Sequence, residues 1–345
     1  MIKPFISREF SVLGMGEVML RLSPIGKERI SHSETFEKNV GGSELNVVSG
    51  ISMLGMRTGI ITKLPQNEIG KFAKHKIRYS GTSDDYVVYD NSDKNRLGIY
   101  YYESGAYPRI PIVLYDRKVS SFTSLKAEEL PDKVYEKANV FHTSGITLAL
   151  GEELKENALN IMKKFSERGS LISFDVNYRA SLWSEQEARE TILRVLPYVN
   201  ILFVSEETQR RMFGMSGTLK EMQKELSKYS KNLEIIASTR RKATTPTKHS
   251  FSSVLYDCKE DCYIVSKPYK DIEVVDRIGS GDAYVAGALY ALLQYQSLSD
   301  MAKYGDAMAA LKNTVSGDIT KCDISDINRI IKNHFESGEK PELMR

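Results

Sequence analysis

A run of small residues that ends in an acid, Asp276-Arg277-Ile278-Gly279-Ser280-Gly281-Asp282, has the composition of a site for phosphoryl chemistry. Glycine and serine let backbone N–H groups approach an anion, and the start of a helix favours negative charge there. The apolar run Ala283–Leu289 predicts a buried helix directly after it. Because a carboxylate repels phosphate, Asp282 suits a catalytic base that takes a proton from an attacking hydroxyl.

Asp282 also has a structural interpretation, since aspartate is a good helix N-cap. A short Gly-Ser-Gly-Asp segment by itself favours that interpretation, because short motifs recur by chance. The long apolar helix after it and the sheet edge described below favour the base.

A second glycine motif, Val40-Gly41-Gly42-Ser43-Glu44-Leu45-Asn46-Val47, precedes a helical pattern over residues 48–55. Paired glycines let the backbone come close to a ligand, and Asn46 supplies both a donor and an acceptor. A tight turn into a helix remains the alternative for this motif.

The elements that must position these motifs alternate between strand and helix. Four short, almost continuously apolar runs (138–141, 170–174, 200–204 and 234–237) each end in polar residues. Such runs predict parallel strands buried on both faces, and amphipathic patterns over 184–195 and 219–229 predict covering helices. We expect an α/β fold in which ligands bind outside the carboxyl ends of the strands.

Two segments, approximately 18–40 and 86–122, depart from this rhythm. They alternate Tyr, Ile, Val and Arg, and Leu97–Glu103 and Ile112–Arg117 predict strands. We interpret both segments as a small β lid over the crevice, within a single domain over residues 1–345. A β extension without a ligand role is the alternative.

Composition excludes several classes of function. The 345 residues carry a net charge of only +3, with basic residues dispersed, so we expect no nucleic-acid partner. The apolar stretches are too short to span a membrane, and the first residues do not form a signal peptide, so we expect a cytoplasmic protein. Scattered histidines predict no structural zinc, and Gly14-Met15-Gly16 lacks the third glycine of a dinucleotide fingerprint.

Taken together, Gly41-Gly42-x-x-x-Asn46 and Asp276–Asp282 resemble the two signatures of the ribokinase-like, or PfkB, family of carbohydrate kinases. The resemblance covers nearly the whole chain. Within the family it is most similar to 2-keto-3-deoxygluconate kinases, through the stretches 16–22, 114–117, 174–183 and 203–207. It implies a three-layer α/β/α domain with a mostly parallel central sheet, a β lid and a homodimer formed through that lid.

The resemblance also implies ligands and the residues that hold them. The ligands are ATP, Mg²⁺ and a sugar acid, with a monovalent cation such as K⁺ as a further cofactor in this family. The implied catalytic group is Asp282 with the backbone amides of Gly279, Ser280 and Gly281. The implied substrate pocket consists of Gly42, Asn46, Tyr100, Tyr115, Arg117 and Arg179. The implied nucleotide site consists of Asn177, Ser205, Ser238, Thr239, Arg240, Gly279, Gly281 and Asp306.

Arg117 and Arg179 suit a sugar acid, because the planar guanidinium binds a carboxylate well. With an uncharged sugar, both arginines would lie in a closed cleft without partners, which is costly. The alternatives are that Arg117 pairs with a neighbouring acid and that Arg179 contacts phosphate.

The chain departs from the family in two places. Ser205-Glu206-Glu207-Thr208 lacks the final acid of the usual tetrad, so no metal residue is assigned, and Ser238–Thr245 replaces a glycine-rich nucleotide loop. In that predicted loop, Arg240 or Arg241 would compensate with charge.

Three functions remain open on these grounds. The first is phosphorylation of 2-keto-3-deoxygluconate to its 6-phosphate, and the second is phosphorylation of fructose, ribose or a related keto acid. The third is a catalytically silent regulatory protein that binds sugar or nucleotide, which the two departures favour and the intact Asp282 opposes.

Overall fold

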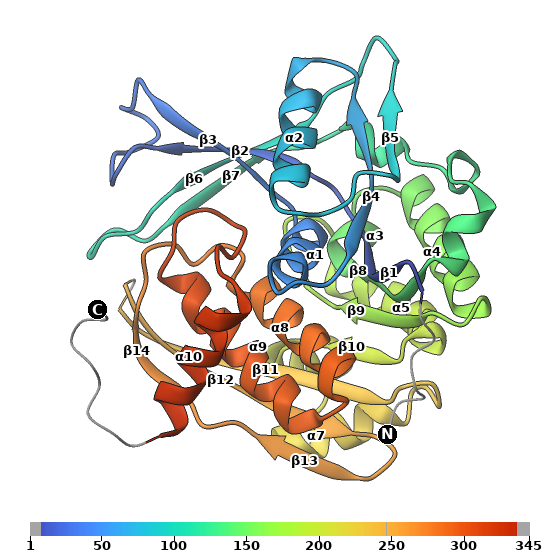
Figure 1. Cartoon of the computed structure of the whole chain (residues 1–345), viewed down its shortest axis with the longest axis vertical. Helices are drawn as coiled ribbons and strands as arrows, with labels where there is room; N and C mark the ends of the chain where they lie inside the picture. Colours follow the sequence, from blue (N-terminus) through green and yellow to red (C-terminus); the bar gives the residue numbers. More distant parts are fainter. Residues whose placement is uncertain (1–7, 246, 337–345) are drawn as a thin grey trace.

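The computed structural model describes residues 8–245 and 247–336, which form a large sheet between helices and a smaller sheet at its edge (Figure 1). The first seven residues, on which part of the signal-peptide expectation rests, lie outside this range. In spatial order the large sheet contains β13 (Cys262–Val265), β12 (Lys248–Asp257), β11 (Ile235–Thr245), β10 (Ile201–Phe203), β9 (Leu171–Asp175), β8 (Ala138–Ser144), β1 (Phe10–Met15), β4 (Thr58–Pro65) and β5 (Val87–Asp90), and β14 (Tyr269–Glu273) pairs with β12.

The strands from β11 to β5 run parallel, whereas β12 pairs antiparallel with β11, β13 and β14. Neighbouring residues along a strand enter opposite cores, as Ile201 and Leu202 do in β10. This two-sided burial explains the apolar runs in the sequence and confirms the predicted α/β fold.

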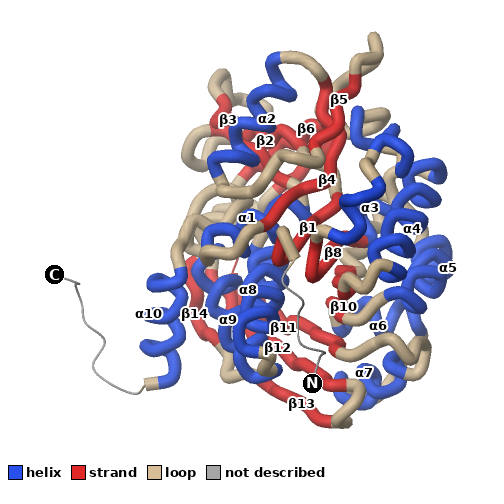
Figure 2. The backbone as a smooth tube through the Cα atoms, turned by 45° about the vertical axis from the view of Figure 1, so that its right-hand side comes forward, coloured by secondary structure: helices blue, strands red, loops and turns tan. Residues whose placement is uncertain are grey.

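Helices cover both faces of this sheet, which gives the predicted three layers. The helices are α1 (Ser43–Met53), α2 (Glu68–Tyr79), α3 (Gly145–Leu148), α4 (Glu152–Glu167), α5 (Glu185–Val195), α6 (Glu206–Phe213), α7 (Leu219–Ser227), α8 (Ser280–Tyr295), α9 (Leu298–Asn313) and α10 (Ile324–Phe335). Helices α1, α8 and α9 pack on one face, and α4 to α7 on the other (Figure 2). Helix α8 is buried along most of its length, as the apolar run after Asp282 predicted.

One predicted loop is wrong. Residues Ser238–Thr245 continue strand β11 and pair with β12, from Ser238 opposite Val254 to Thr245 opposite Lys248. Beyond Ala237 the parallel neighbour β10 has ended, and the antiparallel partner alone supports the strand. The place of a glycine-rich loop is therefore taken by a hairpin that presents side chains.

The small sheet consists of β2 (Met19–Pro24), β3 (Phe36–Gly41), β6 (Gly98–Glu103) and β7 (Ile112–Asp116), in the order β3-β2-β6-β7. Its four strands come from the two segments predicted to form a lid. Strand β5 differs, because it extends the large sheet beside β4 although it belongs to the segment 86–122. Along β7, Val113 and Tyr115 line a cavity, while Ile112 and Leu114 are exposed.

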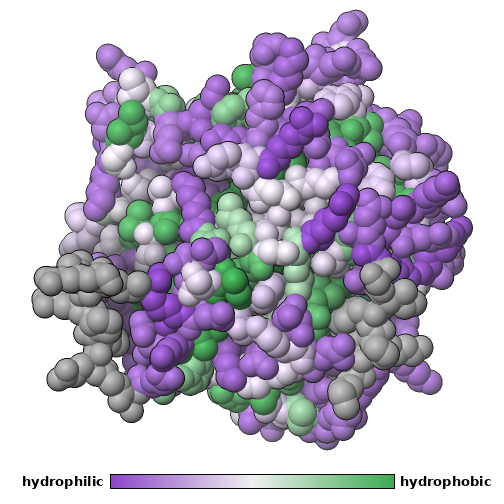
Figure 3. All heavy atoms as spheres, in the orientation of Figure 1, coloured by the Kyte–Doolittle hydropathy of each residue, from purple (hydrophilic) through white to green (hydrophobic). Residues whose placement is uncertain are grey.

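The face of the molecule in Figure 3 is largely hydrophilic, with apolar side chains scattered over it. Among the described residues, no helix combines the length and the apolar character needed to cross a membrane.

Candidate active site

Helix α8 starts at a turn that requires glycine. Gly279 is its N-cap with φ of 80°, and a Cβ there would lie 2.1 Å from the carbonyl oxygen of Asp318. Asp282 therefore lies in the first turn of the helix and is not its N-cap, so the capping interpretation is wrong. The carboxylate is left free for other partners.

Those partners come from the other glycine motif. Ser43 Oγ donates to Asp282 Oδ1 over 2.8 Å, and Asn46 Nδ2 donates to Oδ2 over 2.7 Å. Gly42 precedes both residues, and a Cβ on it would lie 2.2 Å from the carbonyl oxygen of Glu17. The two motifs, far apart in the sequence, thus form one site where α1 and α8 begin.

Burial raises the pKa of Asp282 to about 6, although the hydrogen bonds from Asn46 and Ser43 act to lower it. A carboxylate with this pKa is ionised at neutral pH and is a stronger base than an exposed aspartate. It therefore has the protonation state and the basicity that a general base needs.

A cavity of about 420 Å³ surrounds Asp282. The start of α8 forms one wall, and Tyr100 and Tyr115 of the small sheet form another. These two tyrosines are paired across β6 and β7, with ring centroids 5.8 Å apart. The structure brings all six predicted substrate residues to this cavity, and their contact with a substrate stays a prediction: Gly42, Asn46, Tyr100, Tyr115, Arg117 and Arg179.

The charge of Arg117 is already neutralised. Its Nε donates to Glu17 Oε2 over 2.8 Å, its Nη2 contacts the same oxygen, and Ser120 Oγ donates to Glu17 Oε1. Arg117 is 8% exposed and Glu17 is 3% exposed. The alternative of an internal acid partner for Arg117 is therefore what the structure shows, and its contact with a sugar carboxylate stays a prediction.

Arg179 differs, because it is exposed at the cavity wall. Among the described residues, its one hydrogen bond goes to the carbonyl oxygen of Tyr178, over 3.0 Å. Its positive charge acts to lower the pKa of both Asp282 and Asp175. Arg179 also lines a second cavity, so both predicted partners, the sugar carboxylate and phosphate, remain open to it.

This second cavity, of about 210 Å³, adjoins the first at the carboxyl ends of β9 and β10, beside Ala237 and Thr239 of β11. The two cavities share Asp175, Asn177, Arg179 and Gly281. Of the residues predicted to bind nucleotide, Asn177, Ser205, Thr239 and Gly281 line the second cavity, and Gly279 lines the first.

Three predicted nucleotide residues lie elsewhere. Ser238 is fully buried, and its Oγ accepts hydrogen bonds from Gln209 (3.0 Å) and Gln223 (3.1 Å). Arg240 is exposed and lies 3.4 Å from Glu206. Asp306 is buried on α9 beside a separate cavity of about 100 Å³. The side chains of Ser238 and Arg240 point away from both cavities because β11 is a strand, in which orientation alternates.

No metal ligand was predicted from the sequence, yet Asp175 has the properties of one. It lies at the junction of the two cavities and accepts a hydrogen bond from the Asn177 amide over 2.9 Å. Burial and the charge of Asp282 raise its pKa to about 7. A cation here would relieve the repulsion between the two carboxylates.

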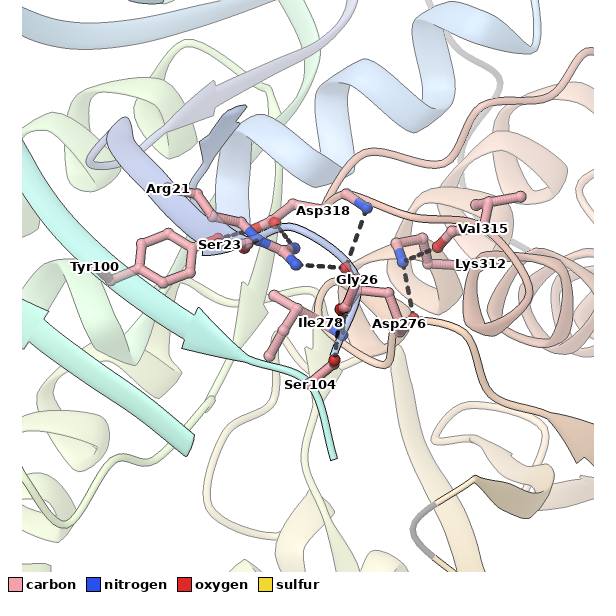
Figure 4. Close-up of polar contacts among 11 residues, drawn as sticks. Arg21, Ser23, Gly26, Tyr100, Ser104, Asp276, Ile278, Lys312, Val315 and Asp318 are labelled. Carbon is pink, nitrogen blue, oxygen red and sulfur yellow. Dashed lines mark hydrogen bonds and ion pairs between the residues drawn. The ribbon is translucent and has the colours of Figure 1, made fainter. Parts of the chain in front are cut away.

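A buried ionic network behind the site was also not predicted (Figure 4). Arg21 of β2 lies 2.6 Å from Asp276 and 2.5 Å from Asp318, which also accepts a hydrogen bond from Tyr100. Lys312 donates to the carbonyl oxygens of Asp276 (3.0 Å) and Val315 (3.1 Å). The network ties the small sheet to the turn before α8, and the sequence carries no spacing signal for it.

Comparison with known proteins identifies the family of this chain. The profile described as "pfkB family carbohydrate kinase" matches residues 10–325. The chain belongs to the pfkB family of carbohydrate kinases. The matched residues include both glycine motifs, the small sheet and the two cavities.

Several individual proteins are similar to this chain over most of its length. The 2-dehydro-3-deoxygalactonokinase of Haloferax volcanii is 32% identical over 92% of this chain and 95% of its own length. The 2-dehydro-3-deoxygluconokinase of Bacillus subtilis is 27% identical over 83% of this chain and 84% of its own. The crystal structure of the Thermotoga maritima 2-dehydro-3-deoxygluconokinase is 32% identical with a TM-score of 0.88, covering 93% of this chain and 99% of that one.

Proposed function

We propose that this carbohydrate kinase transfers the γ-phosphoryl group of ATP to the terminal hydroxyl of 2-keto-3-deoxygluconate, giving the 6-phosphate. The observation that carries the proposal is the position of Asp282, ionised at neutral pH and bonded to Ser43 and Asn46 on the cavity wall. The names of the relatives supply the sugar class, since the two curated relatives and the Thermotoga structure act on 2-dehydro-3-deoxy sugar acids by name.

In the proposed reaction, the Asp282 carboxylate accepts the proton of the sugar hydroxyl. The hydroxyl oxygen forms a bond to the γ-phosphorus, and the bond from that phosphorus to the bridging oxygen of ADP breaks. Backbone amides at the start of α8 stabilise the charge on the transferring group, helped by the helix dipole. The cavity between α8 and the small sheet holds the sugar, and the adjoining cavity holds the nucleotide.

Mg²⁺ belongs to this proposal, because Mg²⁺ neutralises charge between nucleotide phosphates during phosphoryl transfer. Mg²⁺ usually keeps several waters and binds one or two carboxylates besides the phosphates. Asp175 meets that requirement at the junction of the two cavities. We propose that Asp175 would hold the ion.

The decisive assay measures ADP release with ATP and Mg²⁺ on 2-keto-3-deoxygluconate, 2-keto-3-deoxygalactonate, gluconate, fructose and ribose. We expect the keto-deoxy acids to give the highest kcat/KM, and the ratio between the first two decides between the gluconate and galactonate sugars. Turnover led by fructose or ribose would overturn the sugar-acid assignment. Absence of turnover on every sugar, by folded protein, would favour the silent regulatory alternative.

We propose that a second copy of the chain covers the small sheet. Strand β7 is an edge strand, on which Ile112 and Leu114 expose 40% and 51% of their surfaces, and Ile110 just before it exposes 72%. Exposed apolar groups on an unpaired edge favour association. We expect a dimer mass in sedimentation equilibrium and a monomer for Leu114→Glu; a monomeric wild-type protein at micromolar concentration would contradict the proposal.

A further inference from the structure

Two arginines outside the predicted substrate set reach the cavity that contains Asp282. Arg277 belongs to the turn before α8, and Arg241 lies in the extended part of β11. Within residues 8–245 and 247–336, neither guanidinium forms a hydrogen bond or an ion pair with an acid.

The buried arginines near this cavity, by contrast, do have acid partners. Arg117 is paired with Glu17, and Arg21 is paired with Asp276 and Asp318. The positive charge that this cavity offers to a ligand therefore comes from Arg241, Arg277 and the exposed Arg179.

Arg241 and Arg277 are also close enough to repel each other. The pKa of Arg241 is lowered by the desolvation of its guanidinium and by the charge of Arg277, although the side chain as a whole is exposed. The pKa of the buried His249, opposite Ala243 in the hairpin, is lowered by desolvation and then by both arginines. Two cations without an acid partner on one cavity wall repel each other, and an anion bound between them would offset that repulsion.

We infer that Arg241 and Arg277 form an oxyanion site that binds either the phosphate chain of the nucleotide or the carboxylate of the sugar acid. The inference rests on the proposed function for the identity of the two ligands. Phosphate and carboxylate share the geometry that a guanidinium recognises, with two oxygens that accept parallel hydrogen bonds.

The hairpin explains why such a site is needed. A glycine-rich loop would let several backbone amides converge on an anion, whereas pairing with β12 holds the backbone of β11 extended. Alternation along the strand places Arg241 toward the cavity, while Lys242 is exposed and lines neither of the two cavities. Side-chain donors thus take the role of backbone donors.

Kinetics of Arg241→Gln and Arg277→Gln test the inference, with Lys242→Gln as the matched control on the same strand. Loss of a hydrogen bond to a charged group is expected to raise KM about 10- to 100-fold. The KM for ATP rises if the site binds phosphate, and the KM for 2-keto-3-deoxygluconate rises if it binds the carboxylate. Lys242→Gln is expected to leave both KM values within about 2-fold of wild type.

A binding measurement separates this inference from the proposed function. Tripolyphosphate and gluconate are used as probes, and the shift in melting temperature is followed in the absence of turnover. Stabilisation of the wild-type protein by either probe, lost in both arginine variants and kept in Lys242→Gln, supports the site even if no sugar in the panel is phosphorylated. Equal stabilisation of all four proteins, or unchanged KM values for both ligands in both arginine variants, would overturn it.

Discussion

Replacement of Asp282 by asparagine is expected to lower kcat by about 10²- to 10⁴-fold, the usual contribution of a general base. The substitution is nearly isosteric. The carbonyl oxygen of the introduced amide can still accept from Asn46, and its NH₂ group can donate to Ser43 Oγ, so the geometry of the site is retained. KM values for ATP and the sugar acid should change little, and circular dichroism should show a folded protein. A variant with near-normal kcat would refute the assignment of Asp282 as the base.

The pH dependence of kcat tests the role of Asp282 independently. Burial raises the pKa of Asp282 to about 6 in the folded protein, and the carboxylate can accept a proton only when it is ionised. In the wild-type protein, kcat should therefore fall as the pH decreases through about 6 and level off above it. The residual activity of Asp282→Asn should lack this acid limb. A limb of the same midpoint in the variant would assign the titration to another group, such as Asp175.

Replacement of Arg21 by methionine is expected to lower the free energy of unfolding by about 3–5 kcal/mol, the cost of removing one partner from a buried ion pair. Asp276 and Asp318 are 3% and 4% exposed, so both would lose their main counter-charge without access to water. Urea denaturation measures the change. Because Asp318 lines the cavity and Asp276 precedes the glycine turn, kcat should fall as well.

A surface ion pair provides the control for Arg21. Arg194 lies 2.8 Å from Glu156, with side-chain exposures of 51% and 52%. Arg194→Met should cost less than about 1 kcal/mol, as exposed pairs do. Arg21→Lys keeps the charge but loses the fork that reaches two acids, and should lie between the two. Equal effects of Arg21→Met and Arg194→Met would contradict the importance of the buried network.

The local chemistry of the chain was sufficient for much of the fold. The apolar runs at 138–141, 170–174 and 200–204 became parallel strands, because two-sided burial demands continuous apolar sequence. Ser184 caps α5 through a capping box with Glu187, a signal contained within four residues. The turn at Gly279 likewise depends on one residue type at one position.

The errors share a different cause. The segment Ser238–Thr245 was predicted to be a loop, because its polar composition hides a pairing with β12 that only the folded hairpin supplies. Side chains alternate between the two faces of that strand. Ser238 therefore faces Gln209 and Gln223, and Arg240 lies on the exterior. A strand assignment at this point would have placed both side chains away from the two cavities.

By itself, the sequence determined the class of this protein: an α/β kinase with two glycine motifs, a β lid and a candidate base at Asp282. Each of these depends on residues that are near one another in the chain, where spacing and composition carry the information. Only the tertiary structure decided which charges are free. Glu17 neutralises Arg117 from 100 positions away, and Asp318 binds Arg21 from 297 positions away. Ion pairing depends on distance in space, and local sequence patterns do not encode it.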